Sequence, residues 1–227
     1  KRKNEPHNPT ESRRSHVRHR QWTRPILFRT FAYDMEKEGK KKHYILVDAE
    51  YAEAVAGRLR SHYAEVLGRE VPRLDMADWL TCCALDSGLQ QGNNEVQVCI
   101  FHQPEKEHLE HFLPYSLKED LDKQGFDVPQ LAEFTVNCAA KEDIVQGAPL
   151  PIQAALFILR DQGKGHLTLI ADAGDYLQEL RQAALEAPAH PFTIMNMEQP
   201  MGTEGHVVLG FSMVHAMGLR QEDLQRG

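Results

Sequence analysis

The sequence predicts an α/β domain with a mostly parallel central sheet that is covered by helices on both faces. Short apolar runs rich in branched and aromatic residues alternate along the chain with segments of helical periodicity. This alternation is typical of parallel sheets, because a parallel connection needs a crossover and the crossover is usually a helix. The 227 residues can bury a substantial core, and their 41% hydrophobic and 26% charged content is ordinary for a globular protein. We therefore expect a three-layer α/β sandwich.

The first 24 residues differ from the rest of the chain in charge. They hold eight Lys or Arg and two Glu, a local charge of +6, whereas residues 25–227 have 18 basic and 31 acidic residues, a net charge of −13. We expect residues 1–24 to be a disordered basic leader and residues 25–227 to form a single α/β domain. The leader is suited to contacting RNA, or it is a solvated segment with no such role. The acidic domain is unsuited to a broad phosphate-binding surface.

The expected cellular compartment is the cytoplasm. Two of the four cysteines, Cys82 and Cys83, are adjacent, which fits neither a zinc site nor a secreted disulfide framework. They lie beside Trp79 and Leu80 in a helical pattern, so core packing is the expected role. No stretch approaches the roughly 18 consecutive apolar residues of a membrane span, and no apolar signal core is present, so neither a membrane partner nor export is expected.

The secondary-structure elements follow from periodicity and from the residues that end each segment. In the first half we expect a strand over 26–33, a charged connection over 34–42, a strand over 43–47 closed by Asp48, helices over 51–67 and 75–89, and a strand over 96–101. In the second half we expect a polar connection over 102–114, a short helix over 117–125, strands over 134–138, 167–170 and 192–197, and helices over 149–161 and 176–186. The apolar segment 206–217 is compatible with a strand or a helix, and Thr203 with Glu204 favours a helix start.

Aspartates follow two of the expected strands. Asp48 closes the strand 43–47, and Asp172 and Asp175 follow the strand 167–170. In open α/β sheets, ligands bind at the carboxyl ends of the strands. Carboxylates that converge there can hold Mg²⁺ or Mn²⁺, which activates water and stabilises charge in phosphodiester cleavage. The alternative is that these aspartates cap the following helices and face solvent.

Three segments resemble motifs of the NYN domains, which belong to the PIN-like nuclease superfamily. YILVDAEY (44–51) resembles the opening strand, an apolar run followed by Asp, two residues and Asn, and LTLIADAGDY (167–176) is similar to the late strand that leads into Gly-Asp-x-Asp-Phe. PIQAALFIL (151–159) is similar to the helix that opens Val-Asp-Val-x-Leu, and the order of motifs agrees over about residues 44–217. The resemblance implies a PIN/NYN-like fold in which Asp48, Asp172 and Asp175 are the catalytic metal ligands of a ribonuclease.

The same comparison shows departures from the pattern of the family. Tyr51 replaces the usual Asn, Gln153 stands where the helix acid belongs, and Leu159 occupies the second acidic position of that helix. An extra residue also separates Asp172 from Asp175. A neutral amide is a weaker ligand than a carboxylate for a hard cation, so these changes indicate a nuclease centre that has decayed.

Two functions of different class therefore remain open. The favoured one is a noncatalytic relative that keeps the fold to bind a protein or nucleic-acid partner, because Tyr51, Gln153 and the acidic domain all disfavour catalysis on RNA. The alternative is a metal-dependent ribonuclease that uses the three aspartates, with Glu50 and Glu179 near enough in sequence to compensate.

Histidines give a weaker prediction of a metal site. His102, His108 and His111 cluster in one polar segment, and on a helix His108 and His111 would share a face, which can serve zinc. The order of a metalloprotease motif is absent, so a solvated and charge-mixed connection is the alternative.

Overall fold

The computed structural model describes residues 39–103, 108–109, 113–116, 125–141, 148–160, 165–197 and 205–225. In chain order, the elements are β1 (Lys41–Asp48), α2 (Ala49–Leu67), α3 (Met76–Asp86), β2 (Asn94–His102), β3 (His108–Leu109), β4 (Leu113–Ser116), β5 (Gly125–Val128), β6 (Ala132–Ala140), α5 (Leu150–Arg160), β7 (His166–Ile170), the 3₁₀ helix η1 (Gly174–Tyr176), α6 (Leu177–Glu186), β8 (Phe192–Asn196), β9 (His206–Val208), α7 (Leu209–Ala216) and α8 (Gln221–Leu224). The leader expected over 1–24 and the strand expected over 26–33 lie outside the described residues.

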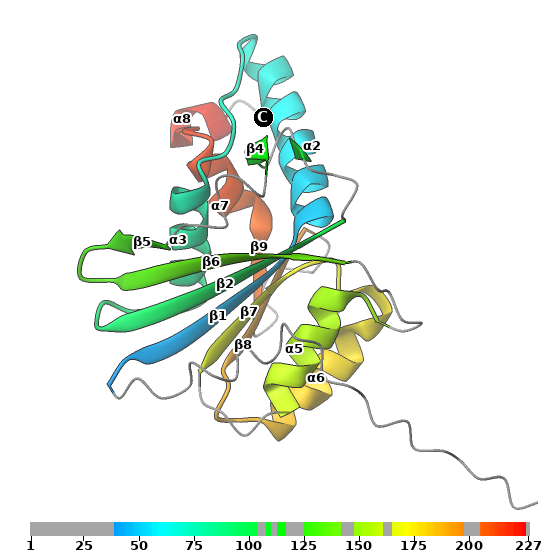
Figure 1. The fold of residues 1–227 in the computed structure, drawn as a ribbon. Coiled ribbons are helices and arrows are strands. Elements are labelled where there is room, and N and C mark those ends of the chain that lie inside the picture. The colour runs from blue at the N-terminus through cyan, green and yellow to red at the C-terminus, as the bar shows by residue number, and fades with distance from the viewer. Residues whose placement is uncertain are drawn as a thin grey trace, which may run out of the picture.

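Seven strands form one sheet in the order β5-β6-β2-β1-β7-β8-β9 (Figure 1). Every neighbouring pair is parallel except β5 and β6, which are antiparallel. Within the described residues, the first strand is the central strand β1; β2 and β6 follow on one side of it, and β7, β8 and β9 lie on the other. The prediction of an α/β fold with a mostly parallel sheet is therefore confirmed.

Helices cover both faces of this sheet. Figure 1 shows α2, α3 and α7 above the sheet and α5 and α6 below it, which gives three layers. Each face has its own hydrophobic core, and β1 contributes to both, with Ile45 and Val47 in the first core and Tyr44 and Leu46 in the second. This division follows from the alternation of side chains along a strand. Residues 43–47 of β1 are all buried, which explains the apolar sequence of this part of the strand.

Local residues set the starts of the first two helices, of which α2 begins two residues before the expected 51–67 and α3 ends at Asp86, three residues before the expected end. The Asp48 carboxylate accepts a hydrogen bond from the Tyr51 N–H at 3.2 Å and so begins α2, and the Asp75 carboxylate accepts from the Asp78 N–H at 2.9 Å and begins α3. Gly68 follows α2 with a φ of 62°, the left-handed conformation in which glycine avoids the steric cost of a Cβ. Cys83 is buried on the apolar side of α3, as expected from its position.

The prediction for the segment after β2 is wrong where the structure describes it. β3 and β4 form a separate antiparallel pair in which His108 lies opposite Ser116. His108 therefore lies in an extended strand and cannot share a helix face with His111, which itself lies outside the described residues. The helix expected over 117–125 is wrong at its last residue, because Gly125 begins the strand β5. Residues 117–124 lie outside the described residues.

The carboxyl-terminal part differs from prediction for a tertiary reason. Segment 206–217 is not one helix, because its first three residues form β9 beside β8 and α7 begins only at Leu209. The helix start expected at residues 203–204 lies outside the described residues. The sequence predicts no strand at β5. Its four residues, Gly-Phe-Asp-Val, are extended because they pair with β6. The rings of Phe126 and Phe134 also stack, with centroids 4.4 Å apart.

Candidate functional site

The strand-end aspartates Asp48 and Asp172 lie at the same edge of the sheet. β1 and β7 are adjacent and parallel, with Val47 opposite Ile170, so Asp48 comes one residue and Asp172 two residues after this pair. The chain leaves β1 for β2 on one side and returns to β7 on the other, which makes this the point where the strand order reverses. Ligands of open α/β sheets bind at such a point. We call this side of the sheet the carboxyl edge.

A lysine, however, pairs with the first of these aspartates. Lys141 Nζ lies 2.8 Å from Asp48 Oδ1 and 2.5 Å from Glu50 Oε2. All three side chains are largely withdrawn from water, with exposed fractions of 10% for Lys141, 17% for Asp48 and 15% for Glu50. We call these residues the lysine triad. One ammonium group therefore bridges two carboxylates that come from consecutive elements of the chain.

The ends of three adjacent strands hold the lysine triad in place. Asp48 closes β1, Glu50 lies in the first turn of α2, and Lys141 follows β6. The Lys141 N–H donates to the carbonyl of His102 at 2.8 Å, and the Gln103 N–H donates to Glu50 Oε1 at 2.7 Å. The pairing of β6, β2 and β1 therefore brings the main chain of Lys141 close enough for its side chain to reach both carboxylates.

The charges of the lysine triad do not cancel. Two carboxylates and one ammonium carry a net charge of −1 when all three are ionised. Burial by itself raises the pKa of the Glu50 carboxyl, but the hydrogen bonds from Lys141 and from the Gln103 amide outweigh burial and hold that pKa below its ordinary value. Glu50 is consequently an acceptor for a cation at neutral pH and is not a general acid.

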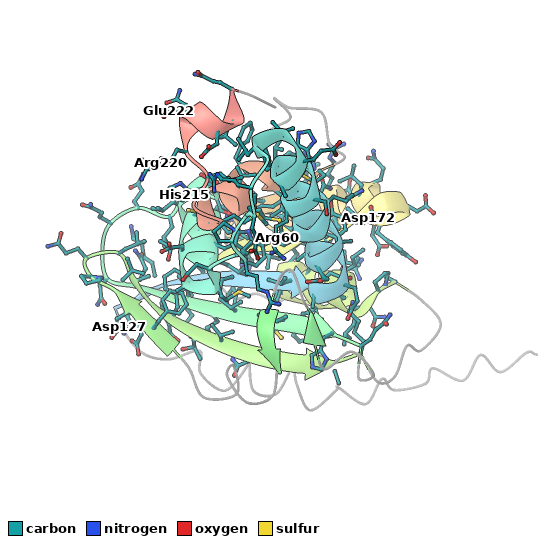
Figure 2. All side chains as sticks on the ribbon, turned by 90° about the horizontal axis from the view of Figure 1, so that it is seen from above. Arg60, Asp127, Asp172, His215, Arg220 and Glu222 are labelled. Atoms are coloured by element: carbon teal, nitrogen blue, oxygen red, sulfur yellow. The ribbon has the colours of Figure 1, made fainter. Side chains whose placement is uncertain are left out.

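The other two predicted site residues are exposed at the carboxyl edge. Asp172 Oδ1 accepts a hydrogen bond from the Gly174 N–H at 2.9 Å, and Figure 2 shows the Asp172 side chain at the periphery of the molecule. Asp175 lies in the first turn of η1 and is also exposed. Across the described ranges, no group of three or more His, Cys, Asp or Glu side chains is placed to hold a metal ion.

Gln153 and Tyr51, two of the residues that depart from the NYN pattern, each take part in a hydrogen bond. Gln153 Nε2 donates to the carbonyl of Ala148, just before α5. Tyr51 reaches across the carboxyl edge, since its hydroxyl accepts a hydrogen bond from the Met197 N–H at 2.9 Å, immediately after β8. Of the two glutamates expected to compensate, Glu50 lies in the lysine triad, whereas Glu179 pairs with Arg160 Nη2 at 2.8 Å on the surface.

Lys141 is the residue at this site that sequence reasoning missed. A single lysine after a strand matches no motif, and its role depends on β6 lying beside β2, which no local pattern reveals. The sequence offered one signal for Lys141, which is that it closely follows an expected strand and should therefore lie at the carboxyl edge. The same signal identified Asp48.

A second buried polar network lies nearer the amino ends of β1 and β7. His43 Nε2 is 2.8 Å from Thr168 Oγ1, the Thr168 hydroxyl donates to Ser87 Oγ at 2.8 Å, and the Ser87 hydroxyl donates to the carbonyl of Cys83 at 2.6 Å. The rings of His43 and His166 stack with centroids 4.6 Å apart and planes inclined by 7°. This network ties the end of α3 to the central strands.

Replacing Tyr51 by Phe should destabilise the protein by about 1 kcal/mol, because the Met197 N–H would lose its acceptor. The free energy of unfolding from urea denaturation is the measurement. Tyr63→Phe in the same helix is the control, and an equal loss in both variants would show that the contact between Tyr51 and Met197 contributes nothing specific.

Comparison with known proteins places the chain in a family without assigning a function. Within the part of the chain that the structure describes, no helix has both the length and the apolar content needed to cross a membrane. No curated protein and no solved structure matches the chain significantly. The model of the family of unknown function DUF6621 matches residues 39–224, and the chain therefore belongs to this family.

Proposed function

We propose that this protein is a noncatalytic PIN/NYN-like domain that acts as a binding module. The observation that carries the proposal is the ion pair between Lys141 and Asp48. Asp48 is the residue that the resemblance assigns as the first metal ligand, and the partly buried ammonium group of Lys141 is already paired with it. A metal-dependent nuclease needs such a carboxylate to be available to its metal.

The arrangement of the strands supports the PIN/NYN-like part of this proposal. Six parallel strands follow the order β6-β2-β1-β7-β8-β9, and the two motif aspartates Asp48 and Asp172 follow β1 and β7 at the point where the order reverses. The resemblance requires these two acids at one edge of the sheet. The departures support loss of catalysis, since Gln153 bonds to its own helix start and Tyr51 is engaged with Met197.

A protein is the partner that the surface of the carboxyl edge supports best. Met197 is 38% exposed after β8 and Phe211 is 62% exposed in the first turn of α7. The two segments are in contact, because Met197 Sδ lies 3.2 Å from the position that a Cβ on Gly210 would take. Exposed large apolar side chains of this kind favour contact with a protein, whereas the net charge of −13 over residues 25–227 disfavours a nucleic acid.

A metal-dependent ribonuclease is the second candidate. The adjacency of β1 and β7 favours it, because it brings Asp48 and Asp172 to a common edge with Asp175 nearby in sequence. In such an enzyme, Mg²⁺ or Mn²⁺ would be held by these aspartates after Lys141 had left Asp48. RNA would then contact the basic leader.

Incubation of the full chain with labelled single-stranded RNA and Mn²⁺ distinguishes the two candidates. The expected result is the same background cleavage for the wild type, for Asp48→Ala and for Asp127→Ala. Asp127 is a suitable control because it is an exposed acid on the edge strand β5, far from Asp172 in Figure 2. Cleavage by the wild type and by Asp127→Ala that is absent in Asp48→Ala would overturn the noncatalytic proposal.

A further inference from the structure

We propose that the lysine triad is a divalent-cation site in which the Lys141 ammonium stands in place of the metal and excludes it. This inference rests on the proposed function and deepens it, because it names the residue that keeps the site free of metal. Its direct consequence is that removal of the Lys141 charge makes Asp48 and Glu50 available to Mn²⁺.

The geometry of the two carboxylates supports this assignment. Asp48 Oδ1 and Glu50 Oε2 converge on one cationic nitrogen at 2.8 and 2.5 Å. A hard divalent cation would draw the same two oxygens in to about 2.1 Å and complete its coordination with water. The distance would shorten by about 0.7 Å for Asp48 and by about 0.4 Å for Glu50. Both carboxylates are anchored, Asp48 by the Tyr51 N–H and Glu50 by the Gln103 N–H.

The charges explain why a cation and Lys141 cannot share the site. With Lys141 present, the triad has a net charge of −1, and adding a divalent cation beside the ammonium would place like charges within a few ångströms of each other in a poorly hydrated region. With Lys141 replaced by a neutral side chain, two carboxylates remain uncompensated, and a divalent cation would neutralise them. The main chain of Lys141 is tied to His102, so the sheet fixes the point from which the side chain reaches the two carboxylates.

A merely structural ion pair makes a different prediction. If Lys141 only stabilised the fold, its replacement would lower stability without any response to metal. If it occupies a cation position, its replacement creates a binding site, and the metal then stabilises the variant through linkage. Metal binding by the variant therefore separates the two roles.

The experiment is a titration of Mn²⁺ into the full chain, followed by the electron paramagnetic resonance signal of free Mn²⁺ and by thermal unfolding. Lys141→Met retains the apolar stem of the side chain and removes the charge, and Lys141→Arg retains the charge. We expect one Mn²⁺ per chain in Lys141→Met, with an affinity higher than that of the wild type by about tenfold or more, and a midpoint of unfolding that rises with Mn²⁺. Lys141→Arg should bind as weakly as the wild type, and Asp48→Asn in the Lys141→Met background should abolish the gain.

Two results would overturn the inference. One is a folded Lys141→Met variant that binds Mn²⁺ no better than the wild type, and the other is wild-type binding as tight as that of the variant. If Lys141→Met is unfolded without metal, Mn²⁺ must restore its far-ultraviolet circular dichroism, and failure to do so also overturns the inference. The noncatalytic proposal fails by a separate result, which is Asp48-dependent cleavage of RNA by the wild type.

Discussion

Replacing Lys141 by Met should lower the free energy of unfolding by about 3 kcal/mol in the absence of divalent cations. The ammonium group is 10% exposed and compensates two carboxylates that are 17% and 15% exposed. Removing only the cation leaves Asp48 and Glu50 as neighbouring, partly buried charges of the same sign. Such an uncompensated state costs far more than the loss of a surface ion pair, which is worth at most about 1 kcal/mol.

Urea denaturation with a chelator present measures this effect. Lys40→Met is the matched control, because Lys40 pairs with Glu133 where the side chains are 26% and 52% exposed, and its loss should cost much less than the loss of Lys141. The triple variant Asp48→Asn, Glu50→Gln, Lys141→Met should recover much of the stability, since no charge then remains unpaired. Equal losses in Lys141→Met and Lys40→Met would show that the partial burial of the triad does not make its charges harder to leave unpaired.

Acidification should destabilise the protein markedly before its carboxylates titrate, because of His43. Burial, followed by the proximity of His166, lowers the pKa of His43 from 6.5 to about 3. The hydrogen bonds give the structural reason. The Thr168 hydroxyl donates to Ser87 and therefore accepts from a protonated Nε2 of His43, while Nδ1 has no hydrogen-bond partner among the described residues. A proton on Nδ1 would place an unsatisfied charge in the core.

The direction of the effect follows from the lowered pKa of His43. Between pH 6.5 and 3 the unfolded chain binds a proton at His43 that the folded chain does not. The contribution of neutral His43 to the free energy of unfolding is therefore fully present above pH 6.5 and is lost as the pH falls. The loss is about 1.4 kcal/mol per pH unit, and His166 adds to it because burial lowers its pKa as well. We expect the free energy of unfolding to fall by about 2–3 kcal/mol between pH 6.5 and 4.5.

Urea denaturation at several pH values tests this expectation. His43→Gln keeps a donor for Thr168 and removes the titrating group, so its stability should depend less on pH. His62→Gln, at an exposed position in α2, should retain the pH dependence of the wild type. The same pH dependence in the wild type and His43→Gln would show that His43 remains neutral in the unfolded chain or is charged in the folded one.

Features that depend on local interactions could be predicted from the sequence. The ends of α2 follow from Asp48 and Gly68, and the start of α3 follows from Asp75, because a cap is formed by residues a few positions apart. Alternation of strands and helices predicted the parallel sheet for a similar reason, since each strand and helix carries its own periodicity. The neighbouring positions of Asp48 and Asp172 were also expected, because parallel strands end at a common edge.

The tertiary structure alone decided which groups these aspartates meet. Lys141 and Asp48 are separated by 93 positions, and only the pairing of β6 with β2 and of β2 with β1 brings them together. β5 and β9 exist for the same reason, because each short segment is extended by a neighbouring strand and not by its own propensity. The sequence by itself determined which strands are followed by a carboxylate. The fold determined that Lys141 pairs with one of these carboxylates. The reason is that electrostatic contacts depend on distance in space and not on separation along the chain.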